Sequence, residues 1–398
     1  YHRGIGVFSL MASSSALVVP FVFLFVVTRL WRIGKSQHLL TQVQFFRERW
    51  GSDNLALTLF ILLVVLLIPY LLIGFMGGGI TFSQITDGKV PQWLGSLIIC
   101  AVVSIYVTAG GVRSTAWANT LQTLAFMTLG GVTFVIIVRS LGGLGQAWQG
   151  VDSSLMMHGD RIPLPMLVSY TLIPLSVGMF PHIFMHWLTA RSVDAFRLPI
   201  VAYPLCIAVV WVPSVVLGVL GSAAVPGLEG PAANSILLQM ISKHAPELLV
   251  GLLGAGVFAA VMSSLDSQIL SLSTLFTQDL LRRRGQGKTE DERRQIRLGR
   301  VFVVSILAAT YLLSLLSNRS IFALGVWSFT GVYVIVAAAA AELFVPSLTA
   351  TWYDGATSPP SCTNCTWPSA KFAAVKLVIA VPAAVVSSNC PLVTALTL

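Results

Sequence analysis

A row of hydroxyl side chains runs through an apolar stretch, AAVMSSLDSQILSLSTLFTQD, between residues 259 and 279. If this stretch is a helix, with about 100° between successive residues, five of the hydroxyls fall within about 80° of one another. They are Ser263, Ser264, Ser267, Ser271 and Thr274. Single Ser and Thr residues in membrane helices commonly bond to their own backbone or join helices. Several oxygens on one face also suit a hard monovalent cation, so both interpretations stand.

Asp266 lies among these hydroxyls and is the one acidic residue well inside an apolar segment. An ionised Asp at the centre of a bilayer costs about 2.5–3.5 kcal/mol on insertion scales, so such a residue normally has a partner or a function. Three roles are open: a protonated carboxyl group, a hydrogen bond to a neighbouring helix, or a ligand for an ion or a proton.

The composition indicates that the elements carrying these residues are membrane helices. Of 398 residues, 56% are hydrophobic and only 10% are charged, whereas about 25% are charged in a typical soluble domain. Apolar runs near 20 residues recur along the chain, which predicts an all-α integral membrane protein. We expect ten spans, at residues 5–30, 55–80, 92–111, 116–139, 164–188, 199–222, 248–279, 300–317, 321–345 and 373–396.

The basic residues divide unequally between the two sides that these spans define. Sixteen Lys and Arg fall at 29–50, 113, 189–198 and 282–300, and five fall in the opposite loops. Positively charged loops face the cytoplasm. The loops 29–50, 189–198 and 282–300 are therefore predicted to be cytoplasmic in a multi-pass protein of the plasma membrane. Lipid headgroups and topology explain the net charge of +9 without a nucleic-acid partner.

Other motifs for chemistry are sparse. Cys362 and Cys365 form a lone CxxC pair, without the second pair or spaced His that a zinc site needs. His182 and His186 have the i, i+4 spacing of metal ligands, but no third ligand is in view, which favours a structural or gating role. No HExxH, GxSxG or phosphate-loop motif occurs, so an enzyme ranks last among the functions considered.

Several stretches resemble one transporter family. The segment 259–279 is similar to the signature helix of the sodium:solute symporter family, which carries sugars, proline, pantothenate, choline, iodide and monocarboxylates. Two more stretches resemble family motifs in the same order, and WSFTG (327–331) fits a late helix. These two are GGVRSTAWANTLQ (110–122) and GMFPHIFMHWLTARS (178–192). The resemblance covers roughly residues 1–345.

The resemblance implies a leucine-transporter type of fold, in which two inverted repeats of five helices enclose a site at mid-membrane. With 248–279 as the eighth core helix, segment 5–30 becomes core helix two and segment 321–345 becomes core helix ten. The first core helix is then expected to be absent from this chain. Residues 1–345 form the predicted core, and 346–398 form an atypical C-terminal segment with one further apolar helix.

The same resemblance implies sodium ligands. In the family, one Na⁺ is held between core helices one and eight, and the matching groups here are the Ala260 carbonyl and the Ser263 and Ser264 hydroxyls. Some members have a second sodium site that uses the Asp of a Trp-x-Asp motif. Asn119 stands at that Asp position. The other matching ligands are Ser263, Asp266 and Ser267, and the resemblance then implies that the negative charge moves from position 119 to position 266. The alternative is that Asp266 only hydrogen-bonds Asn119 and holds the two helices together.

The solute is not specified by the sequence beyond a small organic molecule. Members that carry proline place aromatic residues where this chain has Ile173 and Val177, which argues against proline. The candidate walls of a solute pocket are Tyr70, Phe180, Trp327 and Phe329, each of which also fits ordinary packing. The family resemblance predicts sodium-coupled uptake by alternating access. The alternative is a symporter-like sensor domain of a signalling protein.

Overall fold

The structure is a computed structural model, and it describes residues 1–332 except 3, 9, 11, 12, 157–161, 282–291, 318–320 and 322. Every element assigned in this part of the chain is helical. In chain order they are η1 (Gly4–Gly6), α1 (Ser13–Val22), η3 (Phe23–Val27), α2 (Thr28–Ser36), α3 (Gln42–Trp50), α4 (Asp53–Ile85), α5 (Gln92–Ser140), α6 (Leu144–Gln149), η4 (Ser153–Leu155), α7 (Leu164–Leu172), η5 (Ile173–Met179), α8 (Pro181–Thr189), η6 (Val193–Phe196), α9 (Arg197–Ala224), η7 (Gly230–Ser235), α10 (Ile236–His244), α11 (Glu247–Leu275), η8 (Phe276–Leu281) and α13 (Glu292–Leu316). A short apolar helix, Ala323–Val332, follows.

Most of the expected spans have a helical counterpart. Within the described residues, six helices are long and apolar enough to cross a membrane, and the bent pair of α7–η5 and α8 brings this number to seven. The expected spans 92–111 and 321–345 correspond in part to the shorter apolar helices Gln92–Thr108 and Ala323–Val332. Residues 333–345 and the expected span 373–396 lie outside the described residues.

Near the first expected span and in the expected loop 29–50 the structure adds detail. Within the described residues the first candidate span runs from Ser15 to Ser36, and before it Gly4–Gly6 forms a 3₁₀ turn in which Gly4 has a φ of 64°. Part of the expected loop 29–50 is the helix α3. Its start is fixed by Thr41, whose hydroxyl accepts from the Gln44 backbone N–H at 3.1 Å, and it ends at Gly51 with a φ of 58°.

The element α5 contains two expected spans, and its contacts show that its two parts lie beside each other. In the first part, Gly95 packs against Phe82 of α4, and in the second part Leu129 packs against Gly256 of α11. Phe82 also contacts Phe258 of α11, with the ring centroids 4.3 Å apart. Since α4 and α11 are joined there, Gly95 and Leu129 both lie near this contact, although a straight helix would separate them by about 50 Å.

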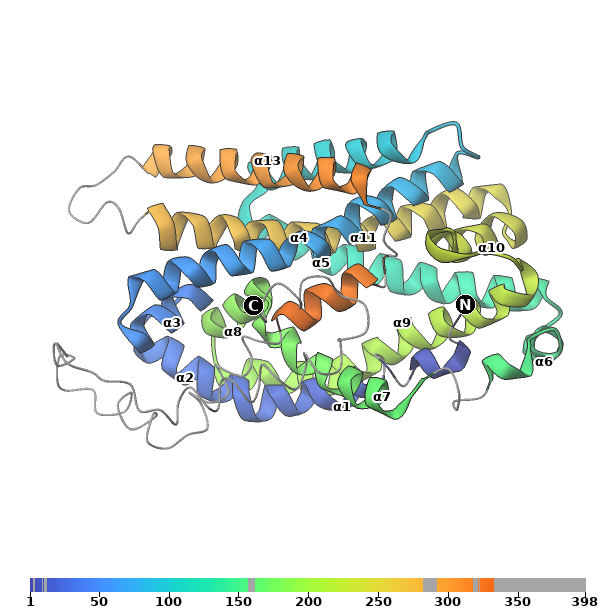
Figure 1. The fold of residues 1–398 in the computed structure, drawn as a ribbon, viewed down its shortest axis with the longest axis horizontal. Helices are drawn as coiled ribbons and strands as arrows, with labels where there is room; N and C mark the ends of the chain where they lie inside the picture. Colours follow the sequence, from blue (N-terminus) through green and yellow to red (C-terminus); the bar gives the residue numbers. More distant parts are fainter. Residues whose placement is uncertain are drawn as a thin grey trace, which may run out of the picture.

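The helices form two layers with the main hydrophobic core between them (Figure 1). One layer holds α4, α5, α11 and α13, and the other holds α1, α2, α7 and α9. The broken segment α7–η5–α8 bends by 55° where Gly178, Met179 and Phe180 precede the Pro181 that begins α8. Helix α11 therefore faces a broken helix across the core, an arrangement known from secondary transporters.

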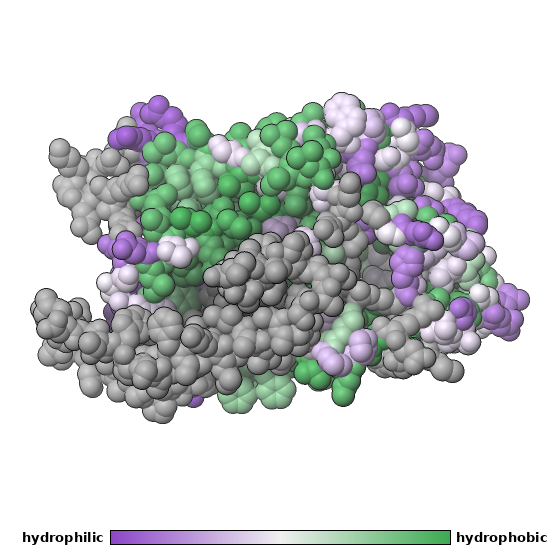
Figure 2. Space-filling view, viewed as in Figure 1, coloured by the Kyte–Doolittle hydropathy of each residue, from purple (hydrophilic) through white to green (hydrophobic). Residues whose placement is uncertain are grey.

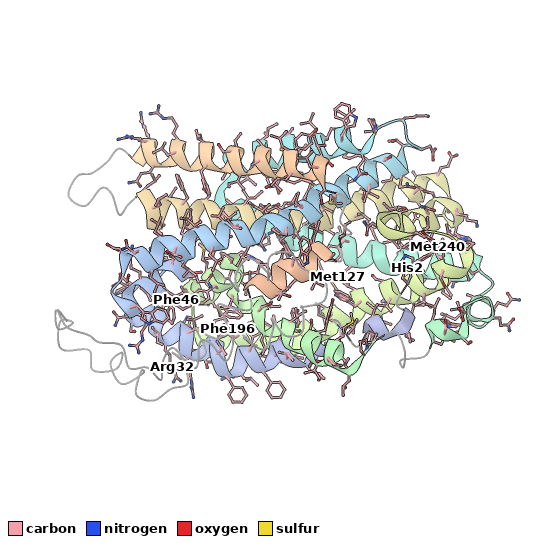
Figure 3. The ribbon with its side chains drawn as sticks, in the orientation of Figure 1. His2, Arg32, Phe46, Met127, Phe196 and Met240 are labelled. Carbon is pink, nitrogen blue, oxygen red and sulfur yellow. The ribbon has the colours of Figure 1, made fainter. Side chains whose placement is uncertain are left out.

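The surface has the polarity of a membrane protein. Figure 2 shows an apolar middle with hydrophilic residues gathered toward the two ends. Arg32 and Phe46 lie toward one end, and His2 and Met240 toward the other (Figure 3). The end with Arg32 also holds α3, the end of η8 and the basic start of α13 (Figure 1). The basic helices α2 and α3 and the basic start of α13, all within segments predicted to be cytoplasmic, are thus gathered at one end of the molecule.

Candidate functional site

The hydroxyls on the polar face of α11 donate to their own helix. These bonds run from Ser267 to the Ser263 carbonyl (3.1 Å), from Ser271 to the Gln268 carbonyl (2.7 Å) and from Thr274 to the Leu270 carbonyl (2.9 Å). This is the ordinary role of Ser and Thr in a membrane helix. A hydroxyl that donates its proton in this way keeps its lone pairs, so the same row still offers acceptors to a cation or to water.

One of these hydroxyls joins α11 to α5. The Asn119 side-chain amide donates to Ser267 Oγ at 2.7 Å. The Asn119 side-chain carbonyl oxygen is buried and accepts no hydrogen bond. The structure therefore brings Asn119 and Ser267 together, two residues that the sequence placed in one site. The hydrogen bond of the Asn119 amide goes to Ser267 and not to Asp266.

Asp266 is fully buried, with 0% of its surface exposed, and neither carboxylate oxygen has a hydrogen-bond partner. The Tyr106 hydroxyl, from the first part of α5, lies beside the carboxylate, but it also lacks a well-formed hydrogen bond. Neither ion pair found among the described residues includes Asp266. A buried charge normally has a partner because its desolvation is costly. The unpartnered oxygens of Asp266 could therefore bind a proton or a cation.

Ala260, Ser263 and Ser264 lie within little more than one turn of α11, before Asp266. Ser263 is half-buried and Ser264 is exposed. The Tyr70 hydroxyl of α4 lies beside the Ser264 side chain, which places an expected solute residue next to the expected sodium ligands. Ala260 lines an apolar cavity of about 270 Å³ between α5, α9 and α11.

Three of the four candidate solute residues converge. The ring centroids of Tyr70 and Phe180 are 5.4 Å apart, those of Phe180 and Phe329 are 4.9 Å apart, and those of Tyr70 and Phe329 are 6.3 Å apart. The group joins α4, the break before α8 and the helix Ala323–Val332. Trp327 lies in a different cluster, packed against Leu72, Met76 and Leu324.

A second cavity of about 270 Å³ lies between α8 and α11 and opens from the Asn119–Ser267 contact. Its polar lining residues come from α5, α8 and α11, and they are Asn119, His182, His186, Thr189, Ser267, Ser271 and Thr274. His182 and His186 thus face the same space, and one His182 ring nitrogen, Nδ1, is buried without a hydrogen-bond partner. Among the described residues, no group of three or more His, Cys, Asp and Glu could hold a metal.

Two residues of this region, Tyr106 and Asp279, are not marked by the sequence motifs. Tyr106 lies in a largely apolar segment, and only the fold places it beside Asp266. Asp279 lies near the end of the helical span that carries Asp266, Glu247–Leu281. It accepts a hydrogen bond from Thr41, which is 238 positions away in sequence. For Thr41 a signal existed, because TQVQ (41–44) matches the capping-box pattern that begins a helix.

The fold and the site together define a class of protein: a multi-pass protein of the cell membrane with the leucine-transporter type of fold. A solved structure described as a substrate-bound, outward-open Na⁺-coupled sialic acid symporter matches with a TM-score of 0.64, covering 87% of this chain and 74% of that one. The two sequences are 13% identical, so this likeness establishes the fold alone.

The chain belongs to the sodium:solute symporter family, whose sequence model matches residues 1–351. Curated relatives include the symporter YhjB of Bacillus subtilis, 23% identical over 261 residues that cover 63% of this chain and 52% of the relative. The sodium/proline symporter of Escherichia coli is 25% identical over 312 residues, covering 74% of this chain and 60% of the relative. The sodium/pantothenate symporter of the same organism is 24% identical over 290 residues, covering 71% and 59%. The chain thus spans between half and three fifths of the length of these relatives.

Proposed function

We propose that this protein takes up a small organic solute by coupling its entry to Na⁺ through alternating access. The family supports this function, because the relatives named above are symporters and two of them are named for sodium. The observation that carries the proposal is Asp266, a fully buried carboxylate without a hydrogen-bond partner beside a row of hydroxyl acceptors. Such a residue in a membrane helix is a functional site by default.

The first sodium position is formed by Ala260, Ser263 and Ser264. The Ala260 carbonyl and the two hydroxyls supply neutral oxygens, which hard cations prefer. The Tyr70 hydroxyl lies beside Ser264, so this position adjoins the aromatic group. Sodium binding would orient Ser264 and, through it, Tyr70.

The second sodium position is formed by Asn119, Asp266 and Ser267. The hydrogen bond between Asn119 and Ser267 supports this set, because it holds the unpartnered Asn119 carbonyl oxygen at the α5–α11 interface. A cation next to Asp266 would stabilise the ionised carboxylate and offset its desolvation. In this proposal Asp266 supplies one negative charge at the buried interface of α5 and α11, and Na⁺ binds to that charge.

The solute position is formed by Tyr70, Phe180 and Phe329, with Trp327 as a further candidate from a neighbouring cluster. The three converging rings come from α4, from the break of the broken helix and from the last described helix. Substrate sites of secondary transporters lie at such breaks near the bilayer midplane. We infer that these rings form an apolar wall for the solute. The backbone groups at the break, which lie outside a regular α-helix, are its polar counterpart.

Uptake into proteoliposomes tests this function. The purified full-length protein is reconstituted, and uptake of radiolabelled L-proline, pantothenate and sialic acid is measured with an inward Na⁺ gradient or an equal K⁺ gradient. These probes are the solutes named for its relatives. We expect at least one to accumulate only with Na⁺. Uptake that is equal in Na⁺ and K⁺ would contradict sodium coupling.

A further inference from the structure

A buried hydrogen bond joins Thr41, before helix α3, to Asp279, at the end of the helical span that carries Asp266. The Thr41 hydroxyl lies 2.8 Å and 3.0 Å from the two carboxylate oxygens of Asp279 and donates to them. Thr41 is fully buried, and Asp279 has 6% of its surface exposed. Asp279 lies in η8, the last turns of the helical span Glu247–Leu281. A charged acceptor makes such a bond stronger than one between neutral groups.

The same threonine begins helix α3. Its oxygen accepts from the Gln44 backbone N–H at 3.1 Å, and the Gln44 side chain accepts from the Leu40 backbone N–H at 2.9 Å. This reciprocal arrangement is a variant of the capping box. Because one hydroxyl serves both as the helix cap and as the donor to Asp279, the start of α3 and residue Leu40 are fixed to the end of α11–η8.

The opposite side of α3 packs on the broken helix. Phe45 is fully buried against Phe184 of α8, with the ring centroids 5.8 Å apart. The side chain of Gln42, also fully buried, donates to the Met179 sulfur at 3.8 Å. Met179 immediately precedes the break. The start of α3 therefore contacts the end of α11–η8, and the helix itself contacts the broken segment η5–α8, which includes Phe180 at its break.

The cavity between α8 and α11 ends at this point. Leu40 lines it together with Met185 and Thr189 of α8 and Thr274 of α11. Leu40 directly precedes Thr41, so any movement of Thr41 away from Asp279 also moves a wall of the cavity. This end of the molecule is the one that holds the basic segments (Figure 1).

We propose that Thr41 and Asp279 form the latch of an inner gate. While the hydrogen bond is made, Leu40 stays at one wall of the cavity between α8 and α11 and narrows it; when the bond breaks, α3 and Leu40 move away from α11 and the cavity widens. The part that this gate plays in a transport cycle rests on the proposed function. The latch itself is a property of the fold and acts without sodium or solute.

Cysteine accessibility tests the latch. The five cysteines are replaced by Ala in the full-length protein, and Met185→Cys is introduced as a reporter inside the cavity. The rate of its modification by a bulky maleimide is measured on the purified protein in detergent, without Na⁺ or solute. The latch variants are Thr41→Val, which keeps the shape but removes the hydroxyl, and Asp279→Asn, which removes the charge.

We expect Thr41→Val to accelerate modification by about tenfold or more, because it removes a hydrogen bond to a charged group. Asp279→Asn accelerates it as well, and Thr41→Ser, which keeps the hydroxyl, leaves the rate at the parent value. Thr58→Val is the matched control, since the exposed Thr58 hydroxyl donates only to the Asn54 carbonyl of its own helix, at 2.9 Å.

Unchanged rates in both Thr41→Val and Asp279→Asn, in monodisperse protein with an unchanged unfolding temperature, would overturn the latch. An equal acceleration in Thr58→Val would overturn it too. If Thr41→Val does not yield folded protein, Asp279→Asn decides alone. Because the assay needs no transport, failure of sodium-driven uptake leaves its result standing, and a negative labelling result leaves sodium coupling standing.

Discussion

At the scale of single residues, Asp266 and its neighbours carry the account. The helical spacing of the hydroxyls predicted one polar face on α11, and Ser267, Ser271 and Thr274 of this face line the cavity between α8 and α11. Asp266 is not among the residues that line this cavity, and its carboxylate lies beside Tyr106 of α5. Periodicity along one helix cannot identify a partner from a second helix, and this is why Tyr106 was not foreseen.

The position of the negative charge gives a first prediction. If Asp266 replaces a carboxylate that other family members have at position 119, Asp266→Ser weakens sodium coupling, and adding Asn119→Asp restores it substantially. The reason is that either residue places one charge at the α5–α11 interface, where Asn119 already contacts Ser267. The apparent Na⁺ affinity of uptake is the measurement. Intact coupling in Asp266→Ser, with only a lower protein yield, would make Asp266 structural.

The converging aromatic rings give a second prediction. Phe329→Leu should weaken the solute affinity by roughly threefold to tenfold, since an aromatic pair contributes about 0.5–1.5 kcal/mol beyond its buried area. Sodium binding measured without solute should change little, because Phe329 contacts rings and not the proposed sodium ligands. Phe302→Leu is the matched control, because the Phe302 ring contacts those of Phe60 and Phe276 and none of this group. An equal loss of solute affinity in both variants would argue against the proposed wall.

At the scale of elements, hydropathy predicted the spans well because burial in lipid needs long apolar helices whatever their partners are. It missed α3, which is short and has a mixed sequence, QVQFFRERW. That helix depends on its cap at Thr41 and on the packing of Phe45 and Phe46, both of which are buried. Local capping and tertiary packing, and not hydropathy, decide such an element.

The close approach of α4 and α5 gives a prediction at this scale. A Cβ atom added at Gly79 would lie 2.5 Å from the backbone carbonyl oxygen of Gln92, whereas one added at Gly77 would meet only Val261, at 3.7 Å. Gly79→Ala should therefore lower the free energy of unfolding by about 1–3 kcal/mol, the usual cost of overpacking. Gly77→Ala should change it little. Thermal unfolding of the purified variants in one detergent measures both, and equal unfolding temperatures would contradict this packing.

At the scale of the whole molecule, the charge division predicts the orientation. A cysteine at Gln37 or Gly285 should be protected from an impermeant thiol reagent in right-side-out vesicles, and one at Gly150 should react. The basis is the excess of basic residues in the loops expected to face the cytoplasm. Of these positions, Gln37 and Gly150 lie in the described residues, after α2 and α6 respectively. Labelling of Gly285→Cys from outside would invert the orientation.

The division of the chain into a core at 1–345 and an atypical segment at 346–398 stays a prediction, since residues 333–398 lie outside the described part. The sequence motifs identified the family and predicted which helix carries the proposed sodium ligands. They could not show that the aromatic group joins three elements distant in sequence, because that follows only from how the broken helix packs against α4 and the last described helix.

Sodium coupling can be tested without knowledge of the solute by measuring the binding of radioactive sodium to the purified full-length protein in a background of K⁺. Saturable binding is expected, and Ser264→Ala should weaken it about tenfold, the effect of losing about 1.4 kcal/mol from one ligand. Ser104→Ala, which removes a hydroxyl bonded only to the Cys100 carbonyl of its own helix at 2.7 Å, should leave the affinity unchanged. Absence of saturable binding, or equal affinities in the parent protein and Ser264→Ala, would contradict the account.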